Sequence, residues 1–278
     1  MTRRKLILIL LSMLMLVQLT ACASSKQPEN KLVRLSTTTS VQDSGLLPEL
    51  EKLFESKSGY SLDIVANGTG AAIKLGETGD ADVILVHAKA AEEDFIEAGF
   101  GVERLPFMHN YFIIAGDEAD PASIAGSSSA AEAFASIMEA EADFVSRGDD
   151  SGTHKAELKI WQQAGLEPSG DWYISAGKGM GPCLTMAGEM QAYIMTDKAT
   201  WLATRDQHGL AMLVDESDDL KNTYSVIAVS SKKHPDINEK GAKAWIDFLA
   251  SDEAAAIIRD YGVSQYGEAL FNYDGFGG

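Results

Sequence analysis

FMHNYFIIA at residues 107–115 and YSVIAV at residues 224–229 are the two longest β-like runs in this 278-residue chain. Between them lies a middle segment with its own alternation of strand and helix patterns. A chain that leaves one lobe and later returns to it has to cross between the lobes twice, and we interpret the two runs as these crossings. The sequence therefore predicts two α/β lobes with a cleft between them. Residues 31–110 and 225–278 form the first lobe, and residues 111–224 form the second.

Short apolar runs alternate with amphipathic stretches on both sides of the crossings. The other predicted strands are Leu32–Ser36, Leu62–Ala66, Asp82–Val86, Asp143–Ser146, Trp172–Ala176, Gln191–Met195 and Met212–Val214. The predicted helices are Gly45–Ser56, Ala71–Glu77, Ala90–Ala98, Ala130–Glu139, Gly152–Ala164, Met180–Glu189, Lys198–Asp206, Ile237–Leu249 and Glu253–Tyr261. Strands separated by helices indicate an α/β chain whose sheets are largely parallel.

Residues 1–21 are typical of an export signal. A basic start, Arg3-Arg4-Lys5, precedes the apolar run Leu6–Leu19, which is too short for a permanent membrane span. The run ends in Leu19-Thr20-Ala21-Cys22, which resembles a bacterial lipobox. That resemblance implies cleavage before Cys22 and lipid attachment to this cysteine. A plain secretory signal that happens to contain a cysteine is the alternative.

The mature chain from Cys22 onward is strongly acidic. It keeps 20 Lys and Arg against 41 Asp and Glu, because the signal holds three basic and no acidic residues, and its net charge is −21. Such a surface excludes nucleic acid as a partner and disfavours charge-driven binding to anionic lipid. The small, polar residues 22–30 are typical of a flexible tether. We expect the chain to be held at the membrane only by its lipid anchor, facing the periplasm or the cell exterior.

The sequence predicts neither a disulfide nor a metal site. Lipidation would consume Cys22, which leaves Cys183 without an intramolecular partner. The five histidines are scattered, with no pair three or four residues apart. A zinc site therefore has no ligand set here.

Four loops each follow a predicted strand, precede a predicted helix and carry neutral hydrogen-bond donors. They are Ser36–Ser40 with Asp43–Gly45, Asn67–Ala72, Arg147–His154 and Gly177–Gly181. Such loops gather at the carboxyl ends of parallel strands, where ligands bind. Helix N-termini add unpaired N–H groups and a positive dipole end.

Any one of these loops has an ordinary structural interpretation, since Ser, Thr, Asp and Gly are common capping and turn residues. The fourth loop also lacks the Gly-Lys-Ser/Thr ending of a phosphate-binding P-loop. Two loops carry a stronger signal. Ser36–Ser40 holds five consecutive hydroxyls, more than one helix cap uses, and Arg147 places a fixed fork of donors ahead of hydroxyls and a helix start. The pattern predicts a site for a small oxyanion.

Several motifs resemble those of the tungstate-binding proteins of ABC transporters. They are Thr37–Leu47 (TTTSVQDSGLL), Asn67–Ala71 (NGTGA), Arg147–Lys155 (RGDDSGTHK), Gly179–Gly181 (GMG), Ala192–Asp197 (AYIMTD) and Tyr224–Val229 (YSVIAV). The resemblance covers about residues 32–271. It implies a type II periplasmic-binding-protein fold, with two α/β lobes, a ligand cleft and two crossover strands. It also implies a permease and its ATPase as partners.

Carried over by motif, the resemblance implies a set of oxyanion-binding residues: Thr38, Thr39, Ser40, Thr69, Arg147, Ser151 and Thr153. Two positions depart from the family pattern. Tyr111 stands where an acidic residue is expected, and Cys183 replaces a usual hydroxyl residue, which leaves the role of the fourth loop open. We expect no cofactor; the ligand would be tungstate or molybdate, and the choice of tungstate rests on the resemblance alone.

Phosphate and sulfate are the competing ligands. A site made only of donors suits a fully deprotonated dianion, whereas hydrogen phosphate requires an acceptor for its proton. Asp149 and Asp150 stand beside Arg147 and could accept it. The other interpretation is that Asp150 caps its helix and Asp149 is solvated, so that neither accepts a proton from the ligand. We favour this interpretation for at least one of the two residues.

Two other classes of function are alternatives. Ser151 with His154 could indicate a serine hydrolase, but a Gly-x-Ser-x-Gly elbow is missing around Ser151, and no pair of carboxylates stands out as an acid/base couple. A phosphate sensor that docks to a signalling partner is the other alternative. We expect a monomeric binding protein with no catalytic residues.

Overall fold

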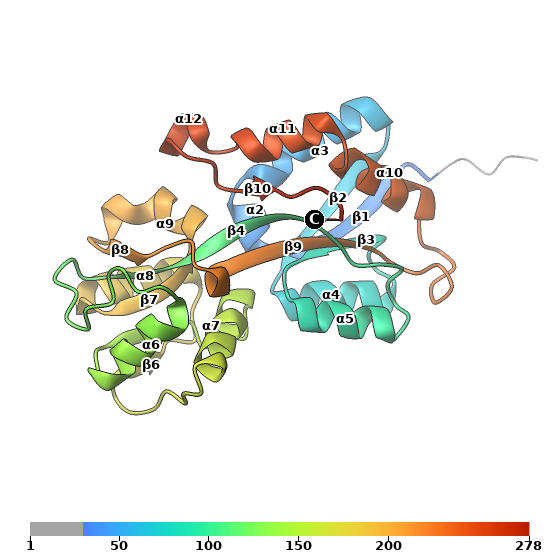
Figure 1. Ribbon diagram of the computed structural model, residues 1–278. Coiled ribbons are helices and arrows are strands. Elements are labelled where there is room, and N and C mark those ends of the chain that lie inside the picture. Colours follow the sequence, from blue (N-terminus) through green and yellow to red (C-terminus); the bar gives the residue numbers. More distant parts are fainter. Residues whose placement is uncertain (1–29, 278) are drawn as a thin grey trace, which may run out of the picture. The chain divides into compact units, whose positions relative to one another are not determined.

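The computed structural model describes residues 30–277 (Figure 1). The predicted signal peptide, the predicted lipid-attachment residue Cys22 and the tether apart from Asn30 lie outside the described residues. Lys31–Gly278 forms one compact unit. Within residues 30–277, no helix has both the length and the apolar character that a bilayer crossing requires.

Within the described residues, ten strands form one sheet with the order β2-β1-β3-β9-β4-β7-β5-β6, and β8 and β10 pair with β4. The strands are β1 Leu32–Thr38, β2 Ser61–Asn67, β3 Val83–Val86, β4 Leu105–Gly116, β5 Phe144–Ser146, β6 Tyr173–Ser175, β7 Tyr193–Asp197, β8 Ala211–Val214, β9 Lys221–Ala228 and β10 Asn272–Tyr273. Every strand predicted from the sequence is present; β10 was not predicted.

The helices that flank this sheet also follow the predicted pattern. They are α2 Thr39–Asp43, α3 Leu46–Ser58, α4 Thr69–Thr78, α5 Lys89–Glu97, α6 Ala130–Glu139, α7 Gly152–Gln163, α8 Met180–Met190, α9 Lys198–Thr204, α10 Glu239–Leu249, α11 Asp252–Asp260 and α12 Val263–Tyr266. Short 3-10 turns follow α9 and precede β9, at Arg205–Gln207 and Asp218–Leu220. The short helices α2 and α12 were not predicted.

Two long strands join the two halves of the sheet, as expected for the crossings. In the first half β1 pairs in parallel with β2 and β3, and in the second half β5 pairs in parallel with β6 and β7. Leu105–Tyr111 of β4 pairs antiparallel with β9, and Phe112–Ala115 of the same strand pairs antiparallel with β7. The α/β fold with two crossing strands is therefore confirmed, but the prediction of largely parallel pairing is wrong for the centre of the sheet, where β4 and β9 pair antiparallel with each other and with their neighbours. The lobe boundaries at 110/111 and 224/225 stay an interpretation of this topology.

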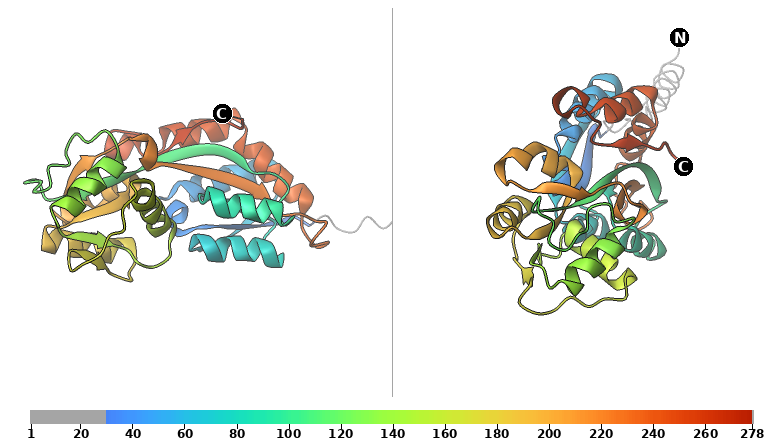
Figure 2. Two further views of the ribbon diagram at one scale, coloured as in Figure 1. Left: turned by 60° about the horizontal axis from the view of Figure 1, so that its bottom comes forward. Right: turned by 60° about the vertical axis from the view of Figure 1, so that its left-hand side comes forward.

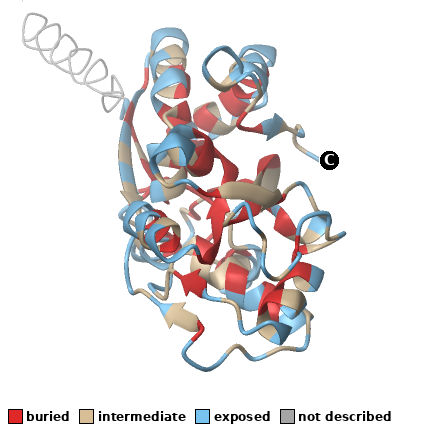
Figure 3. Ribbon diagram, turned by 90° about the vertical axis from the view of Figure 1, so that its left-hand side faces the viewer, coloured by how far each residue is buried: buried red, intermediate tan, exposed pale blue. Residues whose placement is uncertain are grey.

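Helices cover both faces of the first half of the sheet, as Figures 1 and 2 show. On one face α3, α10 and α11 bury a cluster that includes Phe54 and Trp245, whose rings meet edge to face at 5.1 Å. On the other face α4 and α5 bury Ile73 and Phe95 against Ile227 of β9. Figure 3 shows buried residues on the strands and on the inward faces of the helices. Burial on both faces explains why the strands are apolar runs rather than alternating patterns.

The second half has its own aromatic cluster under α6 and α7. Phe134 and Trp161 stack at 4.2 Å, and Phe144 of β5 meets Phe134 at 5.2 Å. Helices α8 and α9 contribute Leu184 and Trp201 to the cluster that also contains Phe54. Helix α7, which contributes Trp161 to this cluster, begins at the candidate site.

Candidate functional site

Three neighbouring strands of the first half end at the same edge of the sheet. Thr38, the last residue of β1, pairs in register with Asn67, the last residue of β2. His87 directly follows β3, which lies on the other side of β1. Parallel pairing therefore delivers Thr38, Asn67 and His87 to one place.

A cavity of about 20 Å³ joins these strand ends to the start of α7. It is lined by Thr38, Thr39, Ser40, Asn67, Gly68, Thr69, His87, Arg147, Ser151, Gly152 and Thr153. All seven residues predicted to hold the oxyanion line it. Four of them precede the first crossing strand, and three lie in the middle segment between the two crossings. That they bind a ligand stays a prediction. A cavity of this size admits a group of a few atoms, since a single water needs roughly 10–15 Å³.

The five consecutive hydroxyls of the first motif divide into two sets. Ser36 donates to the Ala72 carbonyl at 3.0 Å and Thr37 donates to the Leu85 carbonyl at 2.8 Å, so both hold the sheet and α4 in place. Thr38, Thr39 and Ser40 instead line the cavity, and the hydroxyl oxygens of Thr38 and Ser40 lie 3.1 Å apart.

The segment that we expected to be a loop after Thr38 is helical. Thr39 and Ser40 open the five-residue helix α2, and no side-chain hydrogen bond caps it. The intrinsic helix propensity of Thr, Ser, Val and Asp is low, so the turn was not visible in the sequence. Burial of Val41 and a 2.7 Å hydrogen bond from the Ser44 hydroxyl to the Val41 carbonyl hold it. Tertiary packing decides this element.

Thr69 has an unusual hydroxyl. It is the first residue of α4 and is only 1% exposed. Its Oγ1 has no hydrogen-bond partner among the described residues, although it lines the cavity. A buried hydroxyl without a partner costs about 1–3 kcal/mol, so a ligand in the cavity that accepted a hydrogen bond from it would remove this cost.

Arg147 lines the cavity from the second half and is oriented by Asp149. Its Nε and Nη2 donate to Asp149 Oδ2 at 3.1 and 2.5 Å, while the Ser151 N–H donates to Asp149 Oδ1 at 3.2 Å. Partial burial alone would raise the Asp149 pKa, but hydrogen bonds from Ser151 and Arg147 hold that pKa below its usual value. The pair fixes the guanidinium and keeps Asp149 ionised.

The prediction that Asp150 caps α7 is wrong, whereas Asp149 is exposed as predicted. Ser151 is the N-cap, and its Oγ accepts from the His154 N–H at 3.3 Å. Asp150 has a left-handed φ of 58°, which turns its side chain outward: it is 83% exposed and lies 3.3 Å from Lys155 Nζ. Asp149 is the residue that is hydrogen-bonded within the loop.

The residues do not form the Ser151–His154 pair that a serine hydrolase would need. The His154 ring accepts from the Asp150 backbone N–H at 3.0 Å through Nδ1. The hydrogen bond between His154 and Ser151 uses the backbone N–H of His154 and not its ring. The Ser151 hydroxyl therefore lacks a general base in this arrangement.

His87 lines the cavity but was not among the predicted residues. Its Nε2 lies 3.4 Å from the Ser40 hydroxyl, and its ring centroid lies 4.9 Å from that of Tyr224. Burial lowers the pKa of His87 to about 4, although a hydrogen bond with Asn222 acts in the opposite direction. The ring is neutral at neutral pH. The signal was present, because His87 follows a predicted strand just as the other site residues do.

The fourth loop does not contribute to this cavity. None of Gly177–Gly181 is among its lining residues. Cys183 is buried in α8, where its thiol approaches the Lys178 carbonyl at 3.4 Å and burial raises the thiol pKa. Tyr111, the other departure from the family pattern, lies in β4 beside His109. Neither departure alters the cavity lining.

The lining as a whole is rich in donors. It combines hydroxyls, one amide side chain, one imidazole and one guanidinium, and it contains no carboxylate among the described residues. Within residues 30–277, no three His, Cys, Asp or Glu side chains lie close enough together to hold a metal ion. This chemistry suits an anion that needs donors and offers only acceptors.

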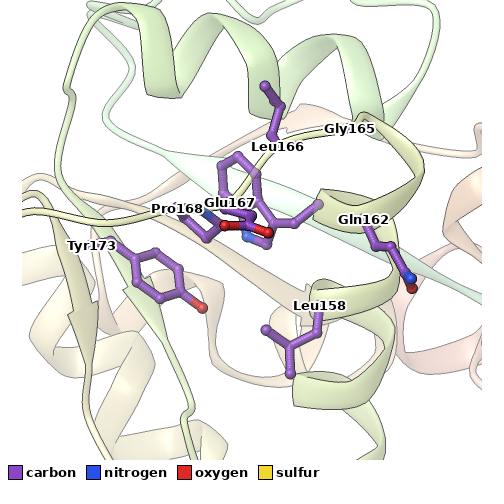
Figure 4. Close-up of a pocket in the computed structure, with 8 residues that line it drawn as sticks. Leu158, Gln162, Gly165, Leu166, Glu167, Pro168 and Tyr173 are labelled. Carbon is purple, nitrogen blue, oxygen red and sulfur yellow. The ribbon is translucent and has the colours of Figure 1, made fainter.

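A larger cavity of about 450 Å³ lies apart from this site, between α7 and the turn that follows it (Figure 4). Leu158, Trp161, Leu166, Pro168 and Tyr173 give it a largely apolar wall. It contains no basic side chain among its lining residues, so it does not offer an oxyanion a countercharge.

Comparison with known proteins places the sequence in a well-populated group. Residues 25–253 match a family described as the PBP superfamily domain. The chain is 43% identical to the tungstate-binding protein TupA of Peptoclostridium acidaminophilum, over 97% of this chain and 98% of that protein. It is 49% identical to a putative ABC transporter anion-binding protein of Haloferax volcanii, over 82% and 68% of the two chains. The structure of the tungstate-binding protein TupA of Desulfovibrio alaskensis superposes with a TM-score of 0.80 at 38% identity, over 88% and 99%.

Proposed function

The chain belongs to the PBP superfamily, and we propose that it captures tungstate or molybdate outside the cytoplasm and delivers it to an ABC importer. Similarity to tungstate-binding and anion-binding proteins over most of the chain supports this proposal. We further propose that the mature protein is a monomer without catalytic activity, that lipid at Cys22 anchors it, and that a permease with its ATPase receives the ion.

The observation that carries the proposal is the cavity lining, in which donors surround a small space and no carboxylate intrudes. Arg147 supplies the fixed positive charge, and the N–H groups of Gly152 and Thr153 at the start of α7 have no acceptor within the helix. The hydroxyl of Thr69 completes the set. Charge-assisted bonds of this kind are about twice as strong as neutral ones.

The same lining argues against hydrogen phosphate. Both oxygens of Asp149 are engaged by Arg147 and Ser151, and Asp150 points to solvent. Neither carboxylate faces the cavity, so the proton of hydrogen phosphate would meet no carboxylate acceptor. Sulfate is a deprotonated dianion like tungstate and is the alternative that size alone has to exclude.

The acidic surface opposes an incoming anion only weakly. Salt screens the field of exposed charges beyond about 8 Å at physiological ionic strength, so the mature charge of −21 acts mainly at short range. Inside the cavity the donors lie in contact with the ion. Contact donors in a dry environment outweigh distant, screened carboxylates.

Calorimetric titration of the mature protein with tungstate, molybdate, sulfate and phosphate tests the proposal. We expect tungstate and molybdate to bind most tightly, and Arg147→Ala to weaken them by at least about 30-fold, or 2 kcal/mol, because the ion loses its fixed countercharge. Lys178→Ala is the matched control, since it removes the same charge from an exposed position outside the cavity. Equal tungstate affinity in Arg147→Ala and the parent would contradict the assignment.

A further inference from the structure

Gly152 makes an unusually close approach across the cavity. A Cβ built on this residue would overlap His87 Cε1 and lie 2.8 Å from His87 Nε2 and 3.0 Å from Thr69 Oγ1. Its backbone does not have a left-handed φ, so the conformation alone would accept any residue. The close approach, rather than the backbone, requires glycine here.

The two partners in this contact belong to different parts of the fold. His87 follows β3 and Thr69 opens α4, both before the first crossing, whereas Gly152 opens α7 in the middle segment. The contact therefore spans the cleft between the two lobes that we propose. It lies in the wall of the anion cavity, since all three residues line it.

His87 is braced from behind by both crossing strands. Its ring packs against the buried Tyr224 of β9 and hydrogen-bonds with Asn222 of the same strand. Asn222 Nδ2 in turn donates to Asn110 Oδ1 of β4 and to the Tyr224 hydroxyl, both at 2.9 Å. A ring held by a buried polar network cannot yield easily when α7 presses on it.

We propose that the contact between Gly152 and the His87 ring is a steric stop that sets how closely the two lobes approach, and so fixes the size of the anion cavity. This inference rests on the proposed function. In a cavity of about 20 Å³ a small change of separation alters every donor-to-anion distance. Hydrogen bonds lose their strength steeply as donor and acceptor move beyond about 3.2–3.5 Å.

The stop also offers a physical basis for ion selection. Tungstate and molybdate have longer bonds to oxygen than sulfate, so they reach donors on both sides of a cavity of fixed width. A smaller dianion meets the same donors at greater distance, because His87 and Gly152 already touch and the lobes cannot close further. Selection by size needs a rigid limit, and this contact supplies one.

A double-mutant cycle with calorimetric titration of tungstate tests the stop in the full mature protein. Gly152→Ala keeps a good helix residue at the first position of α7, and we expect it to weaken tungstate binding by about 10-fold or more because it holds the lobes apart. Gly181→Ala in the first turn of α8 is the control, since a Cβ there meets nothing within 4 Å. It should leave the affinity unchanged.

The His87→Ala background decides the mechanism. With the ring removed, the added effect of Gly152→Ala should shrink to about 3-fold or less, which a merely local defect in α7 would not do. Equal losses in both backgrounds, or no loss in the parent background, would overturn the stop. If the parent protein binds neither tungstate nor molybdate, sulfate or phosphate, the proposed function is contradicted instead. The two failures are therefore distinguishable.

Discussion

Replacing Thr69 with valine should change stability and ligand affinity in opposite directions. Valine keeps the shape of threonine and removes only the hydroxyl, which is buried and has no partner among the described residues. Without ligand, Thr69→Val should stabilise the protein by about 1 kcal/mol, because a desolvated and unpaired donor disappears. With ligand, it should cost a hydrogen bond to a charged group, about 1.5–3 kcal/mol, or roughly 10- to 150-fold in tungstate affinity.

Denaturant unfolding without anion and calorimetric titration with tungstate measure the two effects. Thr37→Val is the matched control. Thr37 of β1 is as buried as Thr69, but its hydroxyl already donates to the Leu85 carbonyl at 2.8 Å. That variant should lose about 1 kcal/mol of stability and keep its affinity within about 2-fold.

Either of two results would contradict the role proposed for the Thr69 hydroxyl. A Thr69→Val protein that binds tungstate as tightly as the parent would mean that the hydroxyl does not face the ion. A Thr69→Val protein that is destabilised as much as Thr37→Val would mean that the hydroxyl already has a partner in the free protein.

Two pH effects of opposite sign follow from buried groups near the site. Burial lowers the His87 pKa to about 4. The neutral ring therefore stabilises the folded protein above the unfolded pKa near 6.5, and this stabilisation is lost as the pH falls toward 4. The difference in unfolding free energy between the parent and His87→Gln should fall by up to about 3 kcal/mol over that range. Burial raises the Glu157 pKa to about 7, although hydrogen bonds from Tyr173, Ser146 and Trp161 oppose this shift. The protonated carboxyl therefore stabilises the folded protein below the unfolded pKa near 4.5, and this stabilisation is lost as the pH rises through 7. Denaturant unfolding of the parent and of Glu157→Gln should show that their difference in unfolding free energy changes by up to about 3 kcal/mol over this pH range. For either variant, a difference that does not vary with pH would contradict the corresponding pKa shift.

Much of the fold could be predicted because its signals are local. Strands buried on both faces leave continuous apolar runs, and helices between them leave amphipathic ones, so the alternation that defines an α/β chain is visible without coordinates. The family resemblance is confirmed by the comparisons. The helix α2 was missed, since Thr39–Asp43 has low propensity and the burial of Val41 holds it in place.

The candidate site was predictable to the extent that it follows strand ends. The hydroxyl run, the Thr69 loop and the Arg147 loop could be picked out, and all of their predicted residues line one cavity. The hydroxyl pattern alone does not separate Ser36 and Thr37, which donate to backbone carbonyls, from the three hydroxyl residues that line the cavity; that choice came from the family resemblance. The capping role predicted for Asp150 was also wrong, because a left-handed φ at this residue turns its side chain to solvent and Ser151 caps the helix instead.

The sequence by itself determined the elements, the donor chemistry of the loops and the acidic character of the mature chain, because each depends on residues close together along the chain. Only the tertiary structure decided that His87 joins the site, that the Thr69 hydroxyl has no partner among residues 30–277 and that Gly152 meets His87. These facts depend on the strand order β2-β1-β3-β9-β4-β7-β5, which brings together residues that are far apart in the chain. Contacts between residues that are distant in the sequence produce no local sequence pattern. Only the packing of the folded chain therefore decides which of these residues meet at the site.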